Sequence, residues 1–468
     1  MTEHFFCIHG HFYQPPREDP FTGIIPAETG AEPYANWNER IHSECYHPNA
    51  KLGNFERISF NIGPTLFEWM MANYPQTCAQ IVQQDQANIR RQGVGNAIAQ
   101  PYHHTILPLA SRKDKETQVY WGMVQFLKRY GRKPDGMWLP ETAVDMETLQ
   151  VLADFRINFT ILAPWQAESA NLDCTEPYRV KLPDGKNINI FFYHNELSGG
   201  ISFSPQWTTN ADVFLQEQVQ PRYDQHKTSR GEPQLLLIAS DGELYGHHQQ
   251  FRDYFLAHLT NGASQRNGME CMNLLLWLRQ NPPRQTVAIR ENTSWSCHHG
   301  VLRWKGDCAC APTDGRWKAY LRQACDRLAH DLDEVYIQAL KPYRVDPWLL
   351  RNRYIYVLLG DITIERLIAE IFGKSLKPES FHTVALLLEA QHQRQRMYTS
   401  CGWFYDDFSR IEPKNCLAYA AQAAFLAYKA VGEDLGTPLQ GVLRNVISHR
   451  TGLRGDIVFN QQLALAYR

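Results

Sequence analysis

Seven short apolar runs, most of them separated by helical patterns, constrain what the N-terminal half of this chain can fold into. In chain order they are Phe5–His9, Arg57–Asn61, Ala97–His103, Gly136–Glu141, Asn158–Pro164, Asn187–His194 and Gln234–Asp241. The continuous apolar character of the last run is typical of a strand covered on both faces, as in a parallel sheet. Strands that alternate with helices indicate a wound α/β domain, and seven of them predict a closed or nearly closed barrel.

Beyond about residue 310 the pattern changes from strands to helices. Helical periodicity covers Trp317–Leu340, Pro347–Phe372, Ser380–Met397 and Asn415–Ala430. A chain of 468 residues is also long for a single core. We therefore predict an α/β fold with two domains. A (β/α)7 barrel spans residues 1–310, with an irregular insert near 262–310, and a mainly α-helical domain spans 311–468 and packs on the barrel.

Composition limits the classes of partner. The net charge is −2 and no basic stripe is present, so nucleic acid is not a predicted partner. No apolar segment is long enough to cross a membrane, and no signal peptide precedes the first strand pattern, so we expect a cytoplasmic protein. The 11 cysteines are odd in number and scattered, which favours reduced thiols. The sequence leaves the oligomeric state open.

Two of the apolar runs end at a carboxylate, the first at Glu141 and the second at Asp241. In α/β folds, ligands bind and chemistry takes place at the carboxyl ends of parallel strands. Two converging acids are the minimum requirement for cleaving a glycosidic bond. Structural carboxylates are common, so the pair alone does not decide the function.

Other polar side chains follow the same predicted strand ends. They are His9, His11, Asn61, His103, His104, Trp165 and His194. Each histidine alone also fits a hydrogen-bonded core position. Because so many polar groups are predicted at one edge of the sheet, their convergence favours a functional site.

Four motifs in order resemble glycoside hydrolase family 57, particularly a subgroup that opens with His-Phe-Tyr-Gln-Pro-Pro-Arg. The first is His11–Arg17, which resembles a region that is usually a tighter His-Gln-Pro. The others are Ser59–Leu66, Gly136–Glu141 and Asp241–His247. The segments Thr293–Cys297 and Ser400–Phe404 are similar to the C-terminal part of that subgroup.

The resemblance implies a (β/α)7 barrel with a helical C-terminal region. It also implies a glycosidase or transglycosylase that acts on α-glucans with retention, as an amylase, 4-α-glucanotransferase or branching enzyme. Glu141 matches the position of the family's nucleophile and Asp241 that of its acid/base. The substrate is then an oligo- or polysaccharide, and because carboxylate chemistry needs no metal, we expect no cofactor and no catalytic metal.

Eight further residues are candidates for binding the sugar. His11, Gln14 and His194 are expected to bind hydroxyls, and Glu243 is expected to share a face with Asp241 if the segment is extended. Stacking platforms are predicted at Trp138, Trp165, Trp304 and Trp403. For Glu243 the alternative is a structural hydrogen bond, and for the tryptophans it is core packing.

Two other functions remain open from the sequence. One is a metal-dependent polysaccharide deacetylase, because the chain contains side chains suited to binding zinc. These are His9, His11, His103, His104, Asp241, His247 and His248. The other alternative is a carbohydrate-binding protein without turnover. Separately, Cys297, Cys308 and Cys310 with His298 and His299 suggest a structural zinc, but their spacing differs from paired CxxC knuckles and favours buried thiols.

Overall fold

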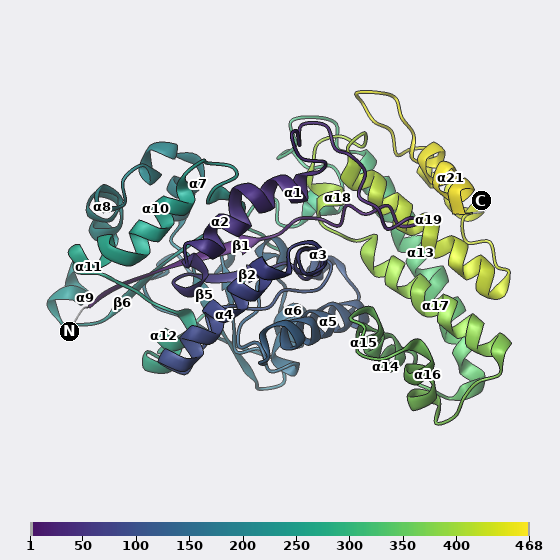
Figure 1. Ribbon diagram of the computed structural model, residues 1–468, viewed down its shortest axis with the longest axis horizontal. Coiled ribbons are helices and arrows are strands. Elements are labelled where there is room, and N and C mark those ends of the chain that lie inside the picture. Colours follow the sequence, from purple (N-terminus) through teal and green to yellow (C-terminus); the bar gives the residue numbers. More distant parts are fainter. Residues whose placement is uncertain (1–2, 467–468) are drawn as a thin grey trace. The chain divides into compact units, whose positions relative to one another are not determined.

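The computed structural model describes residues 3–466 and divides into two compact units (Figure 1). The first unit comprises the chain up to Gln14 together with Ala27–Pro101 and Phe126–Trp295. The second comprises Pro15–Pro26, Tyr102–Gln125 and the chain from Ser296 onward. The α/β class is confirmed, and the strands belong to the first unit. The predicted division into domains at residue 310 remains a prediction.

The strands form two four-stranded sheets. In one, β1 (His4–Phe12) lies between β2 (Ser59–Ile62) and β6 (Gln234–Asp241), all parallel, and β7 (Glu270–Cys271) pairs with the start of β1. In the other, β3 (Phe159–Leu162) is parallel to β5 (Asn187–Phe192), which is antiparallel to β4 (Tyr178–Lys181). The short β8 (Gln285–Thr286) pairs with β4.

The predicted closed (β/α)7 barrel is not observed within residues 3–466. The expected strands at 97–103 and 136–141 make only isolated parallel bridges, which link the ladder of β2 to that of β3. Side chains form hydrogen bonds with backbone groups that a β-ladder would otherwise use. The N–H of Ala97 donates to Asp85 (2.9 Å) and its carbonyl accepts from Arg132 (2.8 Å). Pro101 and Pro140 then remove backbone donors at the ends of these segments.

Side chains from both sheets nevertheless meet in one apolar core. A single buried cluster contains Cys7 of β1, Leu237 of β6, Ile161 of β3 and Phe191 of β5. Two residues beyond the end of β5, the N–H of His194 donates to the carbonyl of Leu237 in the middle of β6 (2.7 Å), which joins the two sheets directly. The carboxyl end of β5 therefore lies next to β6, although no ladder closes between them.

Helices flank the strands of the first unit, and α7 packs on β6 while α6 packs on β5. The bounds of its helices are α1 (Trp37–Ile41), α2 (His47–Lys51), α3 (Pro64–Asn73), α4 (Pro75–Gln92), α6 (Met146–Asp154), α7 (Asn195–Phe203), α8 (Ala211–Val213), α9 (Gln225–Ser229), α10 (Arg252–His258), α11 (Ser264–Arg266) and α12 (Leu274–Gln280). The long α5 spans Arg112–Tyr130. Asp145 caps α6 by accepting from the N–H of Thr148, as its sequence position suggests.

The second unit is helical, and α13 (Trp317–Leu340), α17 (Pro378–Arg396) and α19 (Ile411–Val431) pack side by side (Figure 1). The predicted helix at 347–372 is broken, because Gly360 adopts φ 72° and Thr363 caps a new helix. The remaining helices are α14 (Pro347–Arg353), α15 (Ile355–Leu358), α16 (Ile364–Phe372), α18 (Cys401–Phe404), α20 (Gln440–Leu443) and α21 (Gly455–Ala466).

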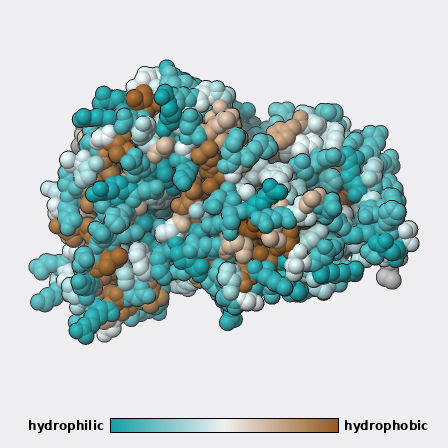
Figure 2. Space-filling model, turned by 180° about the vertical axis from the view of Figure 1, so that it is seen from behind, coloured by the Kyte–Doolittle hydropathy of each residue, from teal (hydrophilic) through white to brown (hydrophobic). Residues whose placement is uncertain are grey.

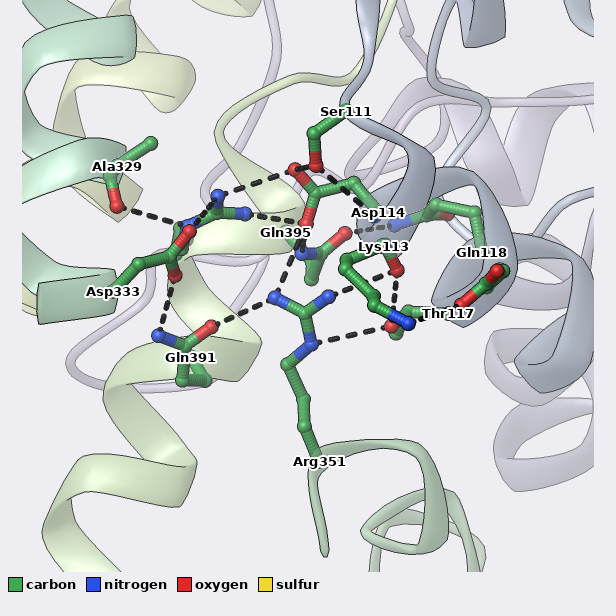
Figure 3. A network of polar contacts seen from close by, with 12 residues as sticks. Ser111, Lys113, Asp114, Thr117, Gln118, Ala329, Asp333, Arg351, Gln391 and Gln395 are labelled. Atoms are coloured by element: carbon green, nitrogen blue, oxygen red, sulfur yellow. Dashed lines mark hydrogen bonds and ion pairs between the residues drawn. The ribbon is translucent and has the colours of Figure 1, made fainter. Parts of the chain in front are cut away.

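A buried ionic network connects the helices of the second unit (Figure 3). Asp114, near the start of α5, accepts hydrogen bonds from Arg394 (2.7 and 3.1 Å) and Gln395 (2.7 Å) of α17. Arg351 of α14 lies 3.1 Å from the same carboxylate and also bonds Gln391. Burial alone raises the pKa of Asp114, but the two guanidinium groups outweigh burial and hold this pKa well below its usual range.

The face of the molecule in Figure 2 is mostly hydrophilic, with small apolar patches scattered over it. Among residues 3–466, none of the helices combines the length and the apolar character that a membrane-spanning segment requires.

Candidate active site

The register of the first sheet brings three polar residues to the same level. His11 of β1 lies opposite Asn61 of β2 on one side and opposite Asp241 of β6 on the other. Residues paired across neighbouring strands project to the same face of a sheet. The predicted convergence of His11, Asn61 and Asp241 at the carboxyl end of this sheet is therefore observed.

Asn61 fixes the tautomers of two buried histidines. His9 lies 3.0 Å from the hydroxyl of Ser59 and 3.2 Å from Oδ1 of Asn61, while Nδ2 of Asn61 lies 3.0 Å from Nδ1 of His11. Burial lowers the pKa of both histidines to about 3, so both rings are neutral. Since Nδ1 of the neutral His11 ring accepts a hydrogen bond from Nδ2 of Asn61, the ring proton of His11 is on Nε2.

Glu141 lies in a strained turn. It adopts φ 58° and ψ 21°, and Thr142 after it adopts φ 48°, both in the left-handed region that side chains rarely occupy. Such a conformation costs about 1–3 kcal/mol per residue and persists only where neighbouring groups hold it. Gln166, which is fully buried, holds this turn by accepting from the Thr142 hydroxyl (2.9 Å) and donating to the Thr142 carbonyl (2.8 Å).

A second segment holds Glu141 from the other side. Val144 and Thr293 form an antiparallel bridge, and the N–H of Trp295 donates to the carbonyl of Glu141 (3.0 Å). The indole Nε1–H of Trp295 also donates to Oε2 of Glu141 (3.0 Å). A hydrogen bond from a neutral donor favours the charged form of a carboxylate and fixes its direction.

The surroundings of Asp241 favour its protonated form instead. Solvent reaches its side chain, yet protein atoms surround the carboxyl closely. Burial and the negative charge of Glu141 raise the pKa of Asp241 from 3.8 to about 7. The carboxyl is therefore largely protonated below neutral pH. The two acids are 100 positions apart in the chain, yet the charge of Glu141 acts on Asp241.

Aromatic rings surround His11 and Glu141. His11 stacks on Trp138 (5.0 Å between centroids), and Trp295 meets the edges of Trp138 (5.0 Å) and Tyr193 (6.3 Å). Trp165 is half-buried, contacts Tyr193 edge-on and donates to the carbonyl of Ser294 (3.0 Å). Trp295 was not among the predicted site residues. In the sequence it stood out only as part of the 293–297 segment, which resembles the family.

Three of the predicted stacking platforms are not supported by the structure. Trp138, Trp304 and Trp403 are fully buried, so their rings pack as core and offer no face to a sugar. Trp403 lies against Arg322 and donates its indole N–H to the carbonyl of Lys318. Both Trp304 and Trp403 belong to the second unit. Trp165 is the predicted platform that remains partly exposed.

The expectation for Glu243 is also corrected. The chain turns at Gly242–Leu244 instead of continuing as a strand, so Glu243 is buried and accepts from the N–H of Tyr13 (2.9 Å) and the hydroxyl of Tyr46 (2.7 Å). Burial raises its pKa to about 8, with a smaller contribution from the charge of Asp241. Gly242 is required at this turn because a Cβ there would lie 2.4 Å from the ring of Phe12.

His194 and Gln14 lie near the predicted site with less specific contacts. His194 caps α7 by accepting from the N–H of Leu197 (3.4 Å), and burial lowers its pKa. Gln14 is half-buried and follows the end of β1 by two residues. Their roles as sugar ligands remain predictions.

The histidines that would form a catalytic metal site do not converge. His9 and His11 bond to Asn61, and His247 bonds to Glu44 (2.5 Å). His103 and His104 belong to the second unit and bond there to Gln118 and Ser400. Within residues 3–466, a cluster with the geometry of a metal site forms only at Cys297, His299, Cys308 and Cys310.

A sequence model of glycosyl hydrolase family 57 matches residues 8–290, a range that includes both Glu141 and Asp241. The chain belongs to glycosyl hydrolase family 57. The family resemblance noted in the motifs is therefore confirmed. A second model, a domain of unknown function named DUF3536, matches residues 314–465 of this family 57 member. No curated protein sequence matches the chain significantly.

Solved structures with the same fold include members of this family. An exo-type maltose-forming amylase from Pyrococcus sp. ST04 superposes with a TM-score of 0.77 and 15% identity, covering 98% of this chain and 88% of that chain. A GH57-type branching enzyme from Pyrococcus horikoshii superposes with a TM-score of 0.64 and 14% identity, covering 98% of this chain and 97% of that chain. A 4-alpha-glucanotransferase from Thermococcus litoralis superposes with a TM-score of 0.57 and 15% identity, covering 92% of this chain and 60% of that chain. At these identities the likeness is one of fold.

Proposed function

We propose that this protein is a retaining glycoside hydrolase or transglycosylase that acts on α-glucans through a covalent glycosyl-enzyme. Glu141 is the nucleophile and Asp241 the acid/base. The observation that carries the proposal is that the surroundings of the two acids favour opposite protonation states. Glu141 accepts a hydrogen bond from Trp295, whereas burial and the charge of Glu141 favour the protonated form of Asp241. Pairs of acids whose environments separate their protonation states are typical of acid/base assignments.

In the first step, the Glu141 carboxylate attacks the anomeric carbon while Asp241 donates its proton to the departing glycosidic oxygen. Glu141 becomes a neutral ester in the glycosyl-enzyme, so the charge that raises the pKa of Asp241 disappears. Asp241 is then a carboxylate able to take a proton from water or from an acceptor hydroxyl. Water gives hydrolysis and a sugar hydroxyl gives transfer.

Neutral His11 and half-buried Trp165 support this site as sugar-binding groups. His11 carries its proton on Nε2 beside Asp241, a suitable donor to a sugar hydroxyl, and Trp165 presents an aromatic surface. The substrate class is supported by the structural relatives, whose names describe a maltose-forming amylase, a branching enzyme and a 4-alpha-glucanotransferase.

The test is a screen of the purified protein against α-glucans and malto-oligosaccharides, with hydrolysis and transfer products followed by NMR. We expect products that first appear with the same anomeric configuration as the cleaved bond. Glu141→Gln keeps the size of the side chain but removes the nucleophile, and we expect its turnover to fall by about 10⁵-fold with glucan binding retained. Glu147→Gln, an exposed glutamate on α6, is the matched control.

Three results would contradict the proposal, namely inversion at the anomeric carbon, unchanged turnover in Glu141→Gln, or glucan binding by the wild type without turnover. The last result would favour the non-catalytic carbohydrate-binding alternative. Acetate release from an acetylated polysaccharide, without cleavage of any glycosidic bond, would favour the deacetylase alternative.

A further inference from the structure

The segment between Trp295 and α13 lacks regular structure apart from one short 3-10 turn at Leu302–Trp304. Irregular segments of this length are uncommon in compact proteins unless they bind a ligand or are held by a cross-link. Three cysteines and one histidine from this segment gather at one point. We propose that Cys297, His299, Cys308 and Cys310 form a structural zinc site in the second unit.

The distances between the ligand atoms fit one tetrahedral ion. With Zn–S bonds of about 2.3 Å and a Zn–N bond of about 2.0 Å, a tetrahedron places two sulfurs about 3.8 Å apart and sulfur and nitrogen about 3.5 Å apart. Here Sγ of Cys297 lies 3.6 Å from Sγ of Cys308 and 3.8 Å from that of Cys310. Nδ1 of His299 lies 3.3 and 3.4 Å from the sulfurs of Cys310 and Cys308.

Disulfides do not explain the cluster. A disulfide requires sulfurs about 2.05 Å apart, whereas the sulfurs here are separated by nearly twice that distance and all of these cysteines are free thiols. The ligand atoms of the four residues all lie within 4.8 Å of one another. Three thiols and an imidazole at these separations match a Cys₃His donor set, which is typical of structural zinc.

Two turns present the ligands in pairs. The N–H of Gly300 donates to the carbonyl of Cys297 (3.1 Å), and the N–H of Ala311 donates to that of Cys308 (2.9 Å). Each turn therefore supplies ligands at its first and third positions. Gly300 adopts φ 75°, which favours glycine at the end of the first turn. The spacing differs from CxxC knuckles because each turn contributes residues separated by one position, and this is why the sequence favoured buried thiols.

The charge around the cluster also suits a bound ion. A zinc ion with three thiolates and a neutral imidazole carries a net charge of −1. Lys318 is fully buried, its Nζ has no hydrogen-bond partner within residues 3–466, and Cys308 is among the groups whose charge acts on it. A buried ammonium is stabilised by nearby negative charge, and a thiolate-rich zinc site adds to the charges of Asp307 and Asp406, which also act on Lys318.

The first experiment measures the metal content of the full-length protein, purified under reducing conditions without chelator, by mass spectrometry of the elements. We expect about one zinc per chain, falling to below about 0.2 in Cys308→Ser and Cys310→Ser. Cys174→Ser, a half-buried thiol in the first unit, is the matched control and should keep its zinc.

The second experiment needs no variant, so it remains decisive if the serine variants fail to fold. Wild-type protein stripped of metal is titrated with Co²⁺, and visible absorption bands of tetrahedral thiolate-bound cobalt are expected to saturate at about one equivalent. The proposal is overturned if the wild type neither contains nor takes up a stoichiometric metal. It is also overturned if folded Cys308→Ser retains full occupancy, or if the native protein holds a Cys297–Cys308 disulfide.

Discussion

Asp114 is buried, whereas solvent reaches the side chain of Asp241, and the surroundings of these two acids act on their charges in opposite directions. Asp114 accepts hydrogen bonds from Arg394 and Gln395 and lies beside Arg351, and these cations hold its pKa well below the usual range despite burial. Asp241 meets the negative charge of Glu141 instead, and burial together with that charge raises its pKa to about 7.

The comparison separates a structural acid from a reactive one. A buried carboxylate paired with arginines is ionised at every physiological pH, so it holds helices together but exchanges no proton. An acid whose nearest charge is another acid changes its protonation near neutral pH and is destabilising when ionised. Perturbations of this second kind are typical of functional sites.

After the loss of the nucleophile in Glu141→Gln, the largest effect on catalysis is expected for Asp241→Asn. Because the amide cannot donate a proton to the leaving oxygen, kcat should fall by about 10²–10⁴-fold on unactivated α-glucans. Substrates with good leaving groups need little protonation, so the loss should be smaller for them. Azide should then restore turnover by attacking the glycosyl-enzyme without base assistance. An equal loss for both kinds of substrate would contradict the role of Asp241 as acid.

Asp114→Asn should mainly affect stability. The change leaves the buried Arg351 without the carboxylate it contacts and leaves Arg394 with Asp333 alone, which costs about 3–5 kcal/mol of unfolding free energy at neutral pH. Since the pKa of Asp114 is lowered by folding, its contribution is present above the pKa of the unfolded chain and is lost as the pH falls. Chemical unfolding at pH 7 measures the loss of unfolding free energy, and unfolding in acid measures how that loss depends on pH. A variant as stable as the wild type would show that the network is not structural.

Trp295→Phe should have an intermediate effect on activity. Phenylalanine keeps an aromatic ring but removes the indole N–H that bonds Oε2 of Glu141. Hydrogen bonds to charged groups contribute about 1.5–3 kcal/mol, so kcat should fall by about 10-fold or more. Trp69→Phe is the matched control, because Trp69 is a half-buried tryptophan of α3 that has no role in the proposed site. Equal losses in the two variants would remove Trp295 from the mechanism.

The smallest expected effect is a gain in stability for Asp241→Asn. Because folding raises the pKa of Asp241, the folded wild type loses stability as the pH rises from about 4 to about 7. Asparagine carries no charge, so the variant should unfold at a slightly higher denaturant concentration at pH 8 than the wild type. The gain should stay below about 1 kcal/mol because solvent reaches and screens this side chain. A loss of stability would contradict the comparison with Asp114.

The apolar runs predicted the parallel strands around the site, and the register of β1 with β2 and β6 confirms that His11, Asn61 and Asp241 meet at one edge. Periodicity could not predict that side chains of Asp85 and Arg132 would bond the backbone groups of Ala97, so that this segment makes only isolated bridges. It also gave no sign of the buried positions of Trp304 and Trp403, since a stacking platform and a core tryptophan look alike in a sequence.

The left-handed turn at Glu141 could not be predicted either, because it depends on Gln166 and Trp295, which are distant in the chain. The cluster at Cys297 and Cys308 differs, because the sequence did suggest a structural zinc there. The spacing matches no common zinc motif, so the sequence could not predict that two turns would bring the ligand atoms together.

The central claim is that Glu141 raises the pKa of Asp241, and a direct titration of that carboxyl tests it. Difference infrared spectra between the wild type and Asp241→Asn, recorded from pH 4 to pH 9, isolate the C=O stretch of protonated Asp241. We expect this band to disappear with an apparent pKa near 7 in the wild type. In a Glu141→Gln background the apparent pKa should be lower, because burial remains but the neighbouring charge is gone. A wild-type pKa near 4, or one that is unchanged by Glu141→Gln, would contradict the account.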